Sequence, residues 1–438
     1  MRITVIGGGI SGLTISYRLA RRGHEVVLVE RDSEPGGLAR GMDLGGYRLD
    51  RYYRHIFRTD EPILSLIREM GLEETLLWLP SQIGFYCDGK IYPFGTPVDL
   101  LRFSPLQLLD RIRFGLGVLY LSKRTDWKDL DVYSAKEWIV RWMGKSTYEV
   151  MWAPLLRLKF GDACEDVSAA WVWGRIHPRA RSRSKGMKTE ELGYMKGSFA
   201  VLMDVLAERT KSSGAEVRLG EEAREIRSLG EKWCVETDQE TFSSDLVVCA
   251  VPNESFLQMA KELPEAYRVQ MENIDYQAVT CLALELEKGL SDIYWLNVVD
   301  PDIRFAGVIE HTNFVPPSHY GGKHVVYLFQ YLPADHPDFA LDVQTTFQSY
   351  LPSLQKMFPH LSEGDILSMT LSKDRYATPV YARGYVSKKP TIQTPLPGIF
   401  LANTTQIYPE DRNMSNGVAL AEEVAIRVED YIRKDGAS

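Results

Sequence analysis

Three glycines near the start of the chain have a spacing that can do chemistry. Gly7, Gly9 and Gly12 follow a short apolar run at 3–6 and precede a helical pattern at 13–22. In such a turn the first glycine permits a tight bend, the second lets the backbone approach a pyrophosphate, and the third lets helix and strand pack closely. The helix N-terminus then offers N–H groups and a positive dipole end to that anion. We expect dinucleotide binding here, with a purely structural glycine turn as the alternative.

An acidic residue follows at the position where a ribose would be bound. Glu30 ends a second apolar strand at 25–30, and a carboxylate there can accept hydrogen bonds from a ribose diol. Strand, glycine turn, helix and strand form a βαβ unit, which implies a parallel sheet with a right-handed crossover.

A second glycine pair shortly after Glu30 decides which dinucleotide is expected. Gly36, Gly37 and Arg40 complete a pattern that resembles the ExxxxxGG signature of FAD enzymes in the amine oxidase, protoporphyrinogen oxidase and phytoene desaturase superfamily. The resemblance implies FAD as the cofactor and an amine oxidase-like fold. In that fold the glycine loop presses against the cofactor and Arg40 offsets pyrophosphate charge. An ordinary Pro-Gly-Gly turn with a solvated arginine is the alternative.

Later segments resemble the same superfamily. Residues 245–252 are similar to its late strand in the FAD domain, and 398–403 with 412–417 are similar to the last strand and the helix start that approaches the flavin. The resemblance also implies cofactor contacts from Ile10, Ser11, Arg31, Leu38, Tyr53, Val217, Asn413, Met414 and Ser415.

One position departs from the superfamily pattern. Where the family has Gly-Asp, this chain has Asn403 and Thr404. We expect Asn403 to contact the cofactor and Asp411 or Glu410 to take the place of the missing aspartate.

Two local resemblances point to different branches. Residues 50–60 resemble a stretch of UDP-galactopyranose mutases whose histidine, matching His55, lies beside the isoalloxazine. Residues 134–162 and 375–381 instead resemble protoporphyrinogen oxidase patterns. The arginine that the mutases carry before the final helix has no counterpart at 405–408, so the oxidoreductase branch is favoured.

Four residues are candidates for catalysis. His55 can hydrogen-bond the flavin or shuttle a proton, unless it is a structural histidine. Glu310, after an apolar strand, can act as a general base or be a polar strand end. Tyr376 and Tyr381 are expected to flank the flavin.

The substrate side is suggested by a basic stretch at 175–188, in an otherwise acidic protein. Arg175, Arg179 and Arg181 could bind a diphosphate or a carboxylate, since arginine forms bidentate pairs with such groups. A solvated loop is the alternative. An apolar stripe with cations at 103–121 could touch a membrane or a lipid-linked substrate, with a core stripe as the alternative.

The elements predict an α/β protein, a Rossmann-type FAD-binding domain of the GR2/amine oxidase type with an inserted α+β substrate domain. Residues 1–58, 196–252 and 395–438 would form the FAD-binding domain. Residues 59–195 would form a mainly helical inserted region, and 253–394 an antiparallel-sheet substrate domain.

The composition excludes several classes of protein. The 438 residues carry a net charge of −8, which argues against a nucleic-acid partner. Five scattered cysteines without a CxxC pair argue against disulfides and a metal site. No apolar stretch reaches the roughly 18 residues of a membrane helix. No signal peptide is expected either, so the prediction is a cytoplasmic protein, with peripheral contact at the inner membrane face left open.

These patterns predict an FAD-dependent oxidoreductase that takes a hydride onto flavin N5 from a small, lipid-linked or nucleotide-linked substrate. No second GxGxxG follows a strand, so the electrons would pass to oxygen or a quinone. One alternative is a mutase-like enzyme acting on a nucleotide- or polyprenyl-diphosphate sugar without net redox change. A non-catalytic flavin-binding component is the third.

Overall fold

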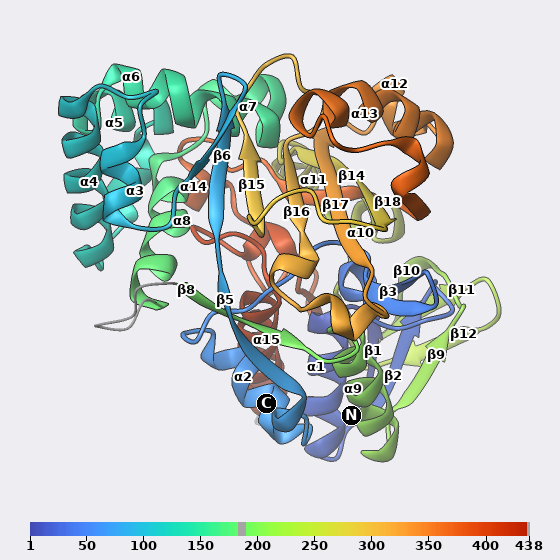
Figure 1. Ribbon diagram of the computed structural model, residues 1–438. Coiled ribbons are helices and arrows are strands. Elements are labelled where there is room, and N and C mark those ends of the chain that lie inside the picture. Colours follow the sequence, from blue (N-terminus) through green and yellow to red (C-terminus); the bar gives the residue numbers. More distant parts are fainter. Residues whose placement is uncertain (183–189, 436–438) are drawn as a thin grey trace.

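A parallel sheet forms the base of the protein. The computed structural model describes residues 1–182 and 190–435 (Figure 1). All neighbouring strands of this sheet run parallel. Their order is β19 (Ile399–Leu401), β13 (Leu246–Cys249), β1 (Arg2–Ile6), β2 (Glu25–Glu30) and β9 (Glu216–Leu219). The predicted βαβ unit is confirmed, because α1 (Ile10–Arg21) joins β1 to β2.

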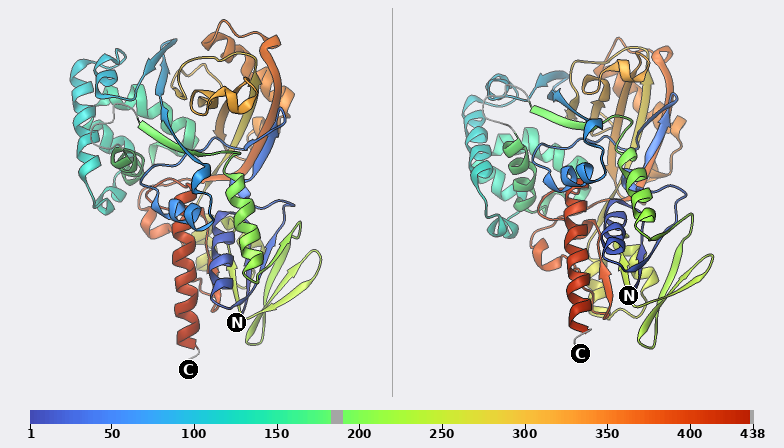
Figure 2. Two further views of the ribbon diagram at one scale, coloured as in Figure 1. Left: turned by 60° about the horizontal axis from the view of Figure 1, so that its bottom comes forward. Right: turned by 90° about the horizontal axis from the view of Figure 1, so that it is seen from below.

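Both faces of the parallel sheet are covered, so its strands are apolar on both sides. Ile3 and Val5 pack with residues of the helices on one face, and Ile6 packs with Trp233 and Phe242 on the other. Figure 2 shows the helices side by side; they are α1, α9 (Ala200–Ser212) and α15 (Met414–Asp435). The opposite layer is a small antiparallel sheet of β10 (Ala223–Leu229), β11 (Lys232–Thr237) and β12 (Thr241–Ser244), with α10 (Asn253–Met259) and α11 (Glu265–Glu272).

A second, larger sheet lies above the first in Figure 1. Its order is β18 (Ile366–Pro379), β14 (Tyr276–Leu286), β17 (His324–Leu332), β16 (Gly307–Glu310), β15 (Trp295–Val298), β6 (Ile83–Cys87) and β7 (Lys90–Pro93). Only the β15–β6 pair is parallel. The β6–β7 hairpin turns at Asp88 and Gly89, whose φ values of 51° and 72° suit a two-residue hairpin turn. Thus the mainly helical stretch contributes two strands to this sheet.

Smaller elements surround the large sheet. Helix α13 packs its apolar face on the sheet, and the β3–β4 hairpin lies against β14 and β18. The bounds of these elements are α12 (Pro337–Ala340), α13 (Val343–Met357), α14 (Tyr385–Lys388), β3 (Gly41–Leu44) and β4 (Tyr47–Asp50).

A helical layer with its own core lies to one side of the large sheet (Figure 1). Phe103, Trp138, Phe160 and Trp171 belong to that core. Its helices are α3 (Pro97–Arg102), α4 (Leu108–Lys123), α5 (Ala135–Trp142), α6 (Lys145–Thr147), α7 (Ala153–Phe160) and α8 (Ala169–Ser182). Capping boxes begin α3 and α5, as the Thr-x-x-Asp and Ser-x-x-Glu spacings dictate.

A two-stranded antiparallel ribbon connects the layers around the parallel sheet to the rest of the protein. Strand β5 (Leu76–Ser81) pairs antiparallel with β8 (Glu190–Met195). Before β5, α2 (Glu61–Glu69) packs against α15. Among the described helices, none is long and apolar enough to cross a membrane.

Candidate functional site

The glycine turn lies where β1 meets α1. Gly7 has a φ of +106°, and a Cβ at Gly12 would lie 1.9 Å from the carbonyl oxygen of Gly7. Helix and strand therefore approach too closely for a side chain. Gly9 differs, because its backbone is extended and its Cβ would meet no atom of the described chain within 4 Å. The space in front of Gly9, at the N-terminus of α1, is therefore open, and an anion could bind there.

Glu30 and the second glycine pair surround this turn. Glu30 is buried, and its carboxylate accepts the N–H of Gly8 at 2.5 Å and that of Asp32 at 2.9 Å. The N–H of Gly36 donates to the carbonyl of Gly8 at 2.8 Å, and a Cβ at Gly37 would lie 3.3 Å from Gly9. The structure thus brings together the two predicted glycine motifs and the acid.

Arg40 lies near this turn but is already paired. Its guanidinium forms an ion pair with Asp32 at 2.9 Å. Because Asp32 neutralises the guanidinium, Arg40 adds little net positive charge near the glycine loop.

A cavity of about 470 Å³ opens next to Arg31, the neighbour of Glu30. Its lining includes Arg224, Met259 and Arg375, together with Ala223 and Tyr376. Tyr376 thus lines this cavity, whereas Tyr381 is buried in the core of the helical layer, and their predicted place on either side of a flavin ring stays a prediction. Val217 is half-buried and packs with the core near β2, and its predicted cofactor contact stays a prediction.

The start of α15 lies beside the start of α1. Met414 and Ser415 are buried, and the Asn413 side chain caps α15 by accepting the N–H of Asn416 at 2.7 Å. Ser11 donates to the carbonyl of Gly417 at 3.1 Å. Two positive helix ends therefore lie side by side near the open space at Gly9.

Asn403, predicted to contact the cofactor, is bonded within the chain instead. Its amide nitrogen donates to the carbonyl of Val251 and to the side chain of Asn253, both at 2.9 Å. Its side-chain oxygen accepts the N–H of Thr405 at 3.1 Å. The amide joins the ends of β13 and β19, which explains why a residue with both donor and acceptor stands where the superfamily has glycine.

Asp411, the other expected substitute, is also engaged. Lys159 and Arg175 each form a 2.7 Å ion pair with its carboxylate, and the indole N–H of Trp171 donates to it at 2.9 Å. Burial alone would raise the pKa of Asp411, but Lys159 and Arg175 outweigh burial and hold the pKa well below its usual range. Burial lowers the pKa of Lys159 to about 8, although Asp411 opposes this. Asp411 therefore joins α7 and α8, with Lys159 and Trp171 on one carboxylate oxygen and Arg175 on the other.

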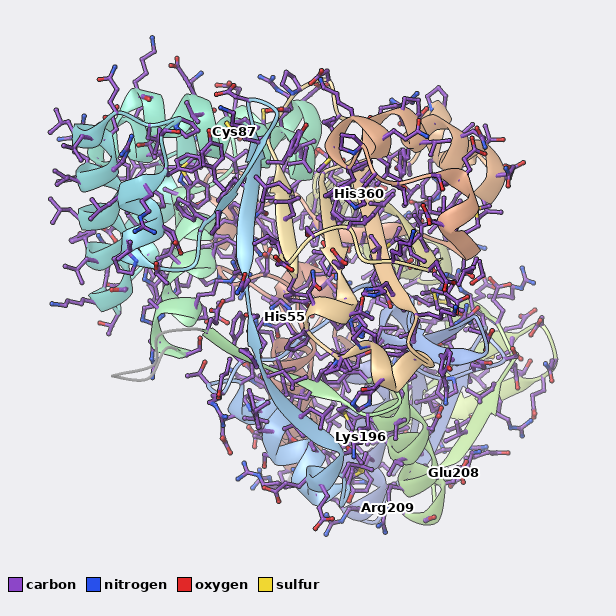
Figure 3. The ribbon with its side chains drawn as sticks, viewed as in Figure 1. His55, Cys87, Lys196, Glu208, Arg209 and His360 are labelled. Carbon is purple, nitrogen blue, oxygen red and sulfur yellow. The ribbon has the colours of Figure 1, made fainter. Side chains whose placement is uncertain are left out.

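His55 stands at the centre of an aromatic cluster, near the middle of the molecule (Figure 3). Its Nδ1 lies 3.3 Å from the hydroxyl of Tyr294, and its ring centroid lies 5.7 Å from that of Trp295. Burial, followed by the nearby Arg179 and Arg175, lowers the pKa of His55 to about 3. The imidazole is therefore neutral at working pH, able to hold a hydrogen bond but not to act as a cation.

Buried polar groups without partners link the glycine turn to this cluster. Tyr52 Oη, Arg54 Nε and Arg412 Nε have no hydrogen-bond partner within the described parts of the chain. Arg412 interacts electrostatically with Arg54 and Tyr53, and Tyr53 packs on Trp295 with centroids 4.9 Å apart. Buried unpartnered polar atoms are rare in proteins. A polar cofactor running from Gly9 to the cluster would supply these partners, so the residues present fit FAD.

Arginines on α8 reach the same cluster. Arg179 lies over the ring of Trp295, 5.7 Å from its centroid, and over that of Phe57 at 5.9 Å. Arg175 is held there by Asp411. Arg181, by contrast, is exposed. The rest of the predicted basic stretch, Arg183, Lys185 and Lys188, lies outside the described residues.

Two predicted catalytic residues, Glu310 and Tyr381, are buried among contacts within the protein. Glu310 is buried, and its carboxylate accepts the N–H groups of Leu290 and Ser291 at 2.9 and 2.8 Å, which fixes the loop before β15. Burial raises the pKa of Glu310 to about 7 despite these bonds. Tyr381 is fully buried in the helical core, where its ring lies 5.6 Å from that of Tyr408.

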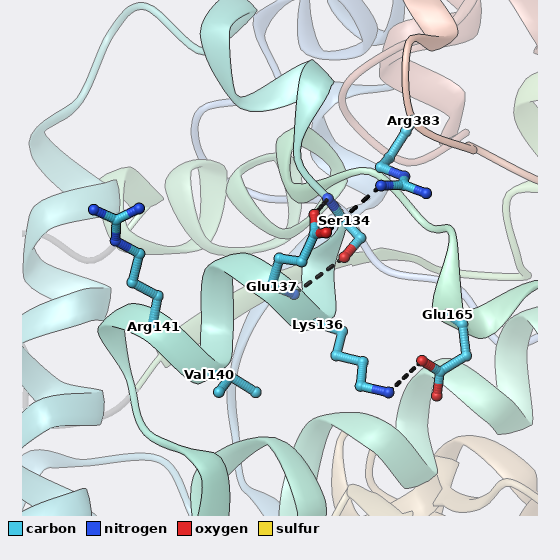
Figure 4. Close-up of a pocket in the computed structure, with 7 residues that line it drawn as sticks. All are labelled: Ser134, Lys136, Glu137, Val140, Arg141, Glu165 and Arg383. Carbon is cyan, nitrogen blue, oxygen red and sulfur yellow. Dashed lines mark hydrogen bonds and ion pairs between the residues drawn. The ribbon is translucent and has the colours of Figure 1, made fainter.

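A second cavity, of about 540 Å³, lies on the helical layer (Figure 4). Four of its five charged lining residues pair with one another: Lys136 with Glu165 at 2.5 Å, and Arg383 with Glu137 at 3.6 Å. We therefore do not assign the functional site to this cavity.

Comparisons with known proteins agree with this geometry. The sequence model of the family described as flavin containing amine oxidoreductase matches residues 10–409. The chain is 26% identical over 277 residues to amine oxidase [flavin-containing] B of Sus scrofa, covering 57% of this chain and 50% of the relative. The chain thus spans about half the length of that curated relative.

Solved structures show the same fold. Cyclohexylamine oxidase from Brevibacterium oxydans IH-35A matches with a TM-score of 0.76 at 14% identity, over 99% of both chains. Reduced UDP-galactopyranose mutase matches with a TM-score of 0.73 at 17% identity, over 99% of this chain and 98% of the other.

Proposed function

Because the chain belongs to the flavin containing amine oxidoreductase family, whose cofactor is FAD, we propose that it is an FAD-dependent oxidoreductase with its reaction site beside His55 and Trp295. The observation that carries this proposal is a set of buried polar atoms without a hydrogen-bond partner in the described residues, Tyr52 Oη, Arg54 Nε and Arg412 Nε, of which Arg54 Nε also lies 3.8 Å from the Asp50 carboxylate.

Several parts of the chain would hold the cofactor. The glycine turn and the N-termini of α1 and α15 would bind the pyrophosphate, and Glu30 the ribose. Arg54 and Arg412 would donate to polar atoms between the pyrophosphate and the ring. Bound FAD supplies a hydride acceptor, and the protein supplies alignment and exclusion of water.

The charges around His55 favour an anionic substrate. Arg179 and Arg175 lie near enough to His55 to lower its pKa, whereas Asp50 and Glu190 act on the neighbouring Tyr294, and Asp411 pairs with Arg175. A protonated amine would be repelled here, whereas a carboxylate or a diphosphate would gain charge-assisted hydrogen bonds. The neutral His55 and the Tyr294 hydroxyl can hold a polar group of the substrate through hydrogen bonds.

A second candidate is a mutase-like reaction on a diphosphate sugar. It is favoured by the same arginines, since two guanidinium groups suit a diphosphate. Such a reaction would need reduced flavin and would give no net consumption of an electron acceptor.

The test is reduction of the bound flavin under anaerobic conditions, followed at its visible absorbance. Donors that carry a carboxylate or diphosphate are compared with amines. We expect anionic donors to bleach the flavin, and Arg179→Gln to raise their KM at least tenfold. Arg181→Gln, on the same helix but exposed, is the matched control and should leave KM unchanged.

Three results would contradict the proposal. Bleaching by amines that is unaffected in Arg179→Gln would contradict the anionic substrate. Sugar isomerisation only after dithionite reduction would establish the mutase-like reaction instead. A purified protein that takes up no FAD would contradict the whole assignment.

A further inference from the structure

Helix α4 exposes an apolar face. The buried residues of this helix are Phe114, Gly117 and Leu121, so its core-facing side is accounted for. Another side carries six large apolar side chains with exposed fractions between 47% and 67%. We call them the α4 face: Leu108, Leu109, Ile112, Leu116, Leu119 and Tyr120.

The spacing of these residues places them on one side of the helix. Positions separated by three, four, eight and eleven residues share a helical face. The α4 stripe predicted from the sequence therefore divides into two faces, one packed on the helical core and the other left in solvent. Isolated exposed leucines need no explanation, but a continuous row of them does.

Neighbouring helices extend the α4 face. Val98 and Leu101 on α3 are 52% and 51% exposed, and Trp142 on α5 is 55% exposed. The Trp142 ring stacks on that of Tyr120, with centroids 6.2 Å apart. The helices α3 and α5 both pack against α4, and the three lie along one outer edge of the molecule in Figures 1 and 2.

Cations border this surface. Arg102, Lys123 and Arg141 are exposed at the ends of α3, α4 and α5. Residues 97–145 contain nine Lys and Arg against six Asp and Glu, although the whole chain has a net charge of −8. This exposed apolar surface is thus also locally basic.

We propose that the α4 face docks the protein onto an anionic lipid membrane. An apolar helix face with Trp and Tyr at its border and Lys and Arg around it is the arrangement by which helices lie in a membrane interface. The apolar residues would enter the acyl boundary, and the cations would contact lipid phosphates. A membrane fits better than an acidic protein, because each exposed side chain stands on a convex helix rather than in a groove.

The inference goes beyond the proposed reaction and does not depend on it. Helix α4 packs against α8, which carries Arg175 and Arg179. Docking through α4 would therefore bring the arginines of the reaction site close to the lipid surface. A lipid-linked anionic substrate could be reached from there.

The test is vesicle flotation of the full-length protein. Phosphatidylcholine vesicles are compared with vesicles that also contain phosphatidylglycerol. We expect binding to the anionic vesicles, and a decrease in it at high salt. The double variant Leu109→Glu/Leu116→Glu should lower the partition coefficient onto vesicles by about tenfold or more, since two exposed leucines would no longer gain free energy by entering the acyl region.

Matched controls separate docking from folding. Ile426 is 51% exposed on α15, so Ile426→Glu makes the same kind of apolar-to-acidic change once on a helix elsewhere and should bind vesicles like the wild type. Lys123→Glu/Arg141→Glu changes no apolar residue. It should reduce binding to the anionic vesicles and leave binding to the phosphatidylcholine vesicles unchanged. Both sites are exposed, so the flavin content and the unfolding midpoint should not change.

Two outcomes would overturn the proposal. In one, the wild-type protein stays with the unbound fraction, or the leucine double variant floats as well as the wild type. In the other, the wild type self-associates without vesicle binding and the double variant is monomeric, in which case the α4 face joins two copies of the chain.

Discussion

Replacing Gly9 by alanine should separate cofactor binding from folding. The backbone at Gly9 has φ −71° and ψ −179°, which alanine adopts without strain. Its Cβ would meet no atom of the described chain within 4 Å. Without FAD, the free energy of unfolding should therefore stay the same or rise by about 0.4–1 kcal/mol, because alanine restricts the unfolded chain.

The same methyl group would occupy the space proposed for the pyrophosphate. At least one charge-assisted hydrogen bond from the turn would be lost, which costs about 1.5–3 kcal/mol. The Kd for FAD should therefore increase by about ten- to 150-fold. Apoprotein is titrated with FAD by fluorescence quenching, and stability is measured by urea unfolding of the same apoprotein.

Two further alanine variants serve as controls for this experiment. In Gly12→Ala the new Cβ would lie 1.9 Å from the Gly7 carbonyl oxygen, so both stability and FAD binding should be lost. In Gly115→Ala the Cβ would lie 3.4 Å from Leu100, an ordinary contact in α4, so neither should be lost. The reasoning is refuted if Gly9→Ala binds FAD like the wild type, or if its apoprotein is destabilised by more than about 1 kcal/mol.

Three other substitutions test the remaining side chains. Because burial lowers the pKa of His55 to about 3, the unfolded state takes up a proton that the folded state does not, and stability falls as pH drops from 6.5 towards 3. The change that His55→Gln makes in the free energy of unfolding should therefore be more favourable at pH 5 than at pH 7 by roughly 2 kcal/mol. Urea unfolding of both proteins at the two pH values would measure this difference. Asp411→Asn removes the negative charge between Lys159 and Arg175 and should cost about 3–5 kcal/mol in urea unfolding at pH 7; a loss below about 1 kcal/mol would contradict the ion-pair assignment. Glu310→Gln leaves one acceptor oxygen for two backbone N–H groups, so stability should fall by about 1–3 kcal/mol while the flavin reduction rate is unchanged; a large loss of rate alone would return Glu310 to a catalytic role.

Features that depend on short spacings could be predicted from the sequence. The turn at Gly7–Gly12, the acid at Glu30 and the hairpin at Asp88-Gly89 each arise within a few residues, where local backbone geometry decides the conformation. The parallel sheet followed from the βαβ unit because a helix that crosses between two strands lets both run in the same direction.

Features that depend on distant contacts could not be predicted. Asp411 is 252 residues from Lys159 in the chain, and no local pattern reveals that the two side chains meet. Tyr376 and Tyr381 are close in sequence, yet β18 ends at Pro379 between them and their side chains enter different layers. The apolar positions of α4 were visible in the sequence, but only the packing shows which of them stay exposed.

The strand order of the parallel sheet has a consequence for how the protein is made. Strand β1 leaves the ribosome first, but it lies between β2 and β13, and β13 begins at residue 246. The edge strand β19 and helix α15 follow only after residue 398. The nucleotide cradle therefore closes late in synthesis, because one edge of its apolar first strand stays unpaired until more than half of the 438 residues have been made. Such non-local pairing slows folding and exposes nascent chains to aggregation, so FAD binding is expected to be a late, post-translational step.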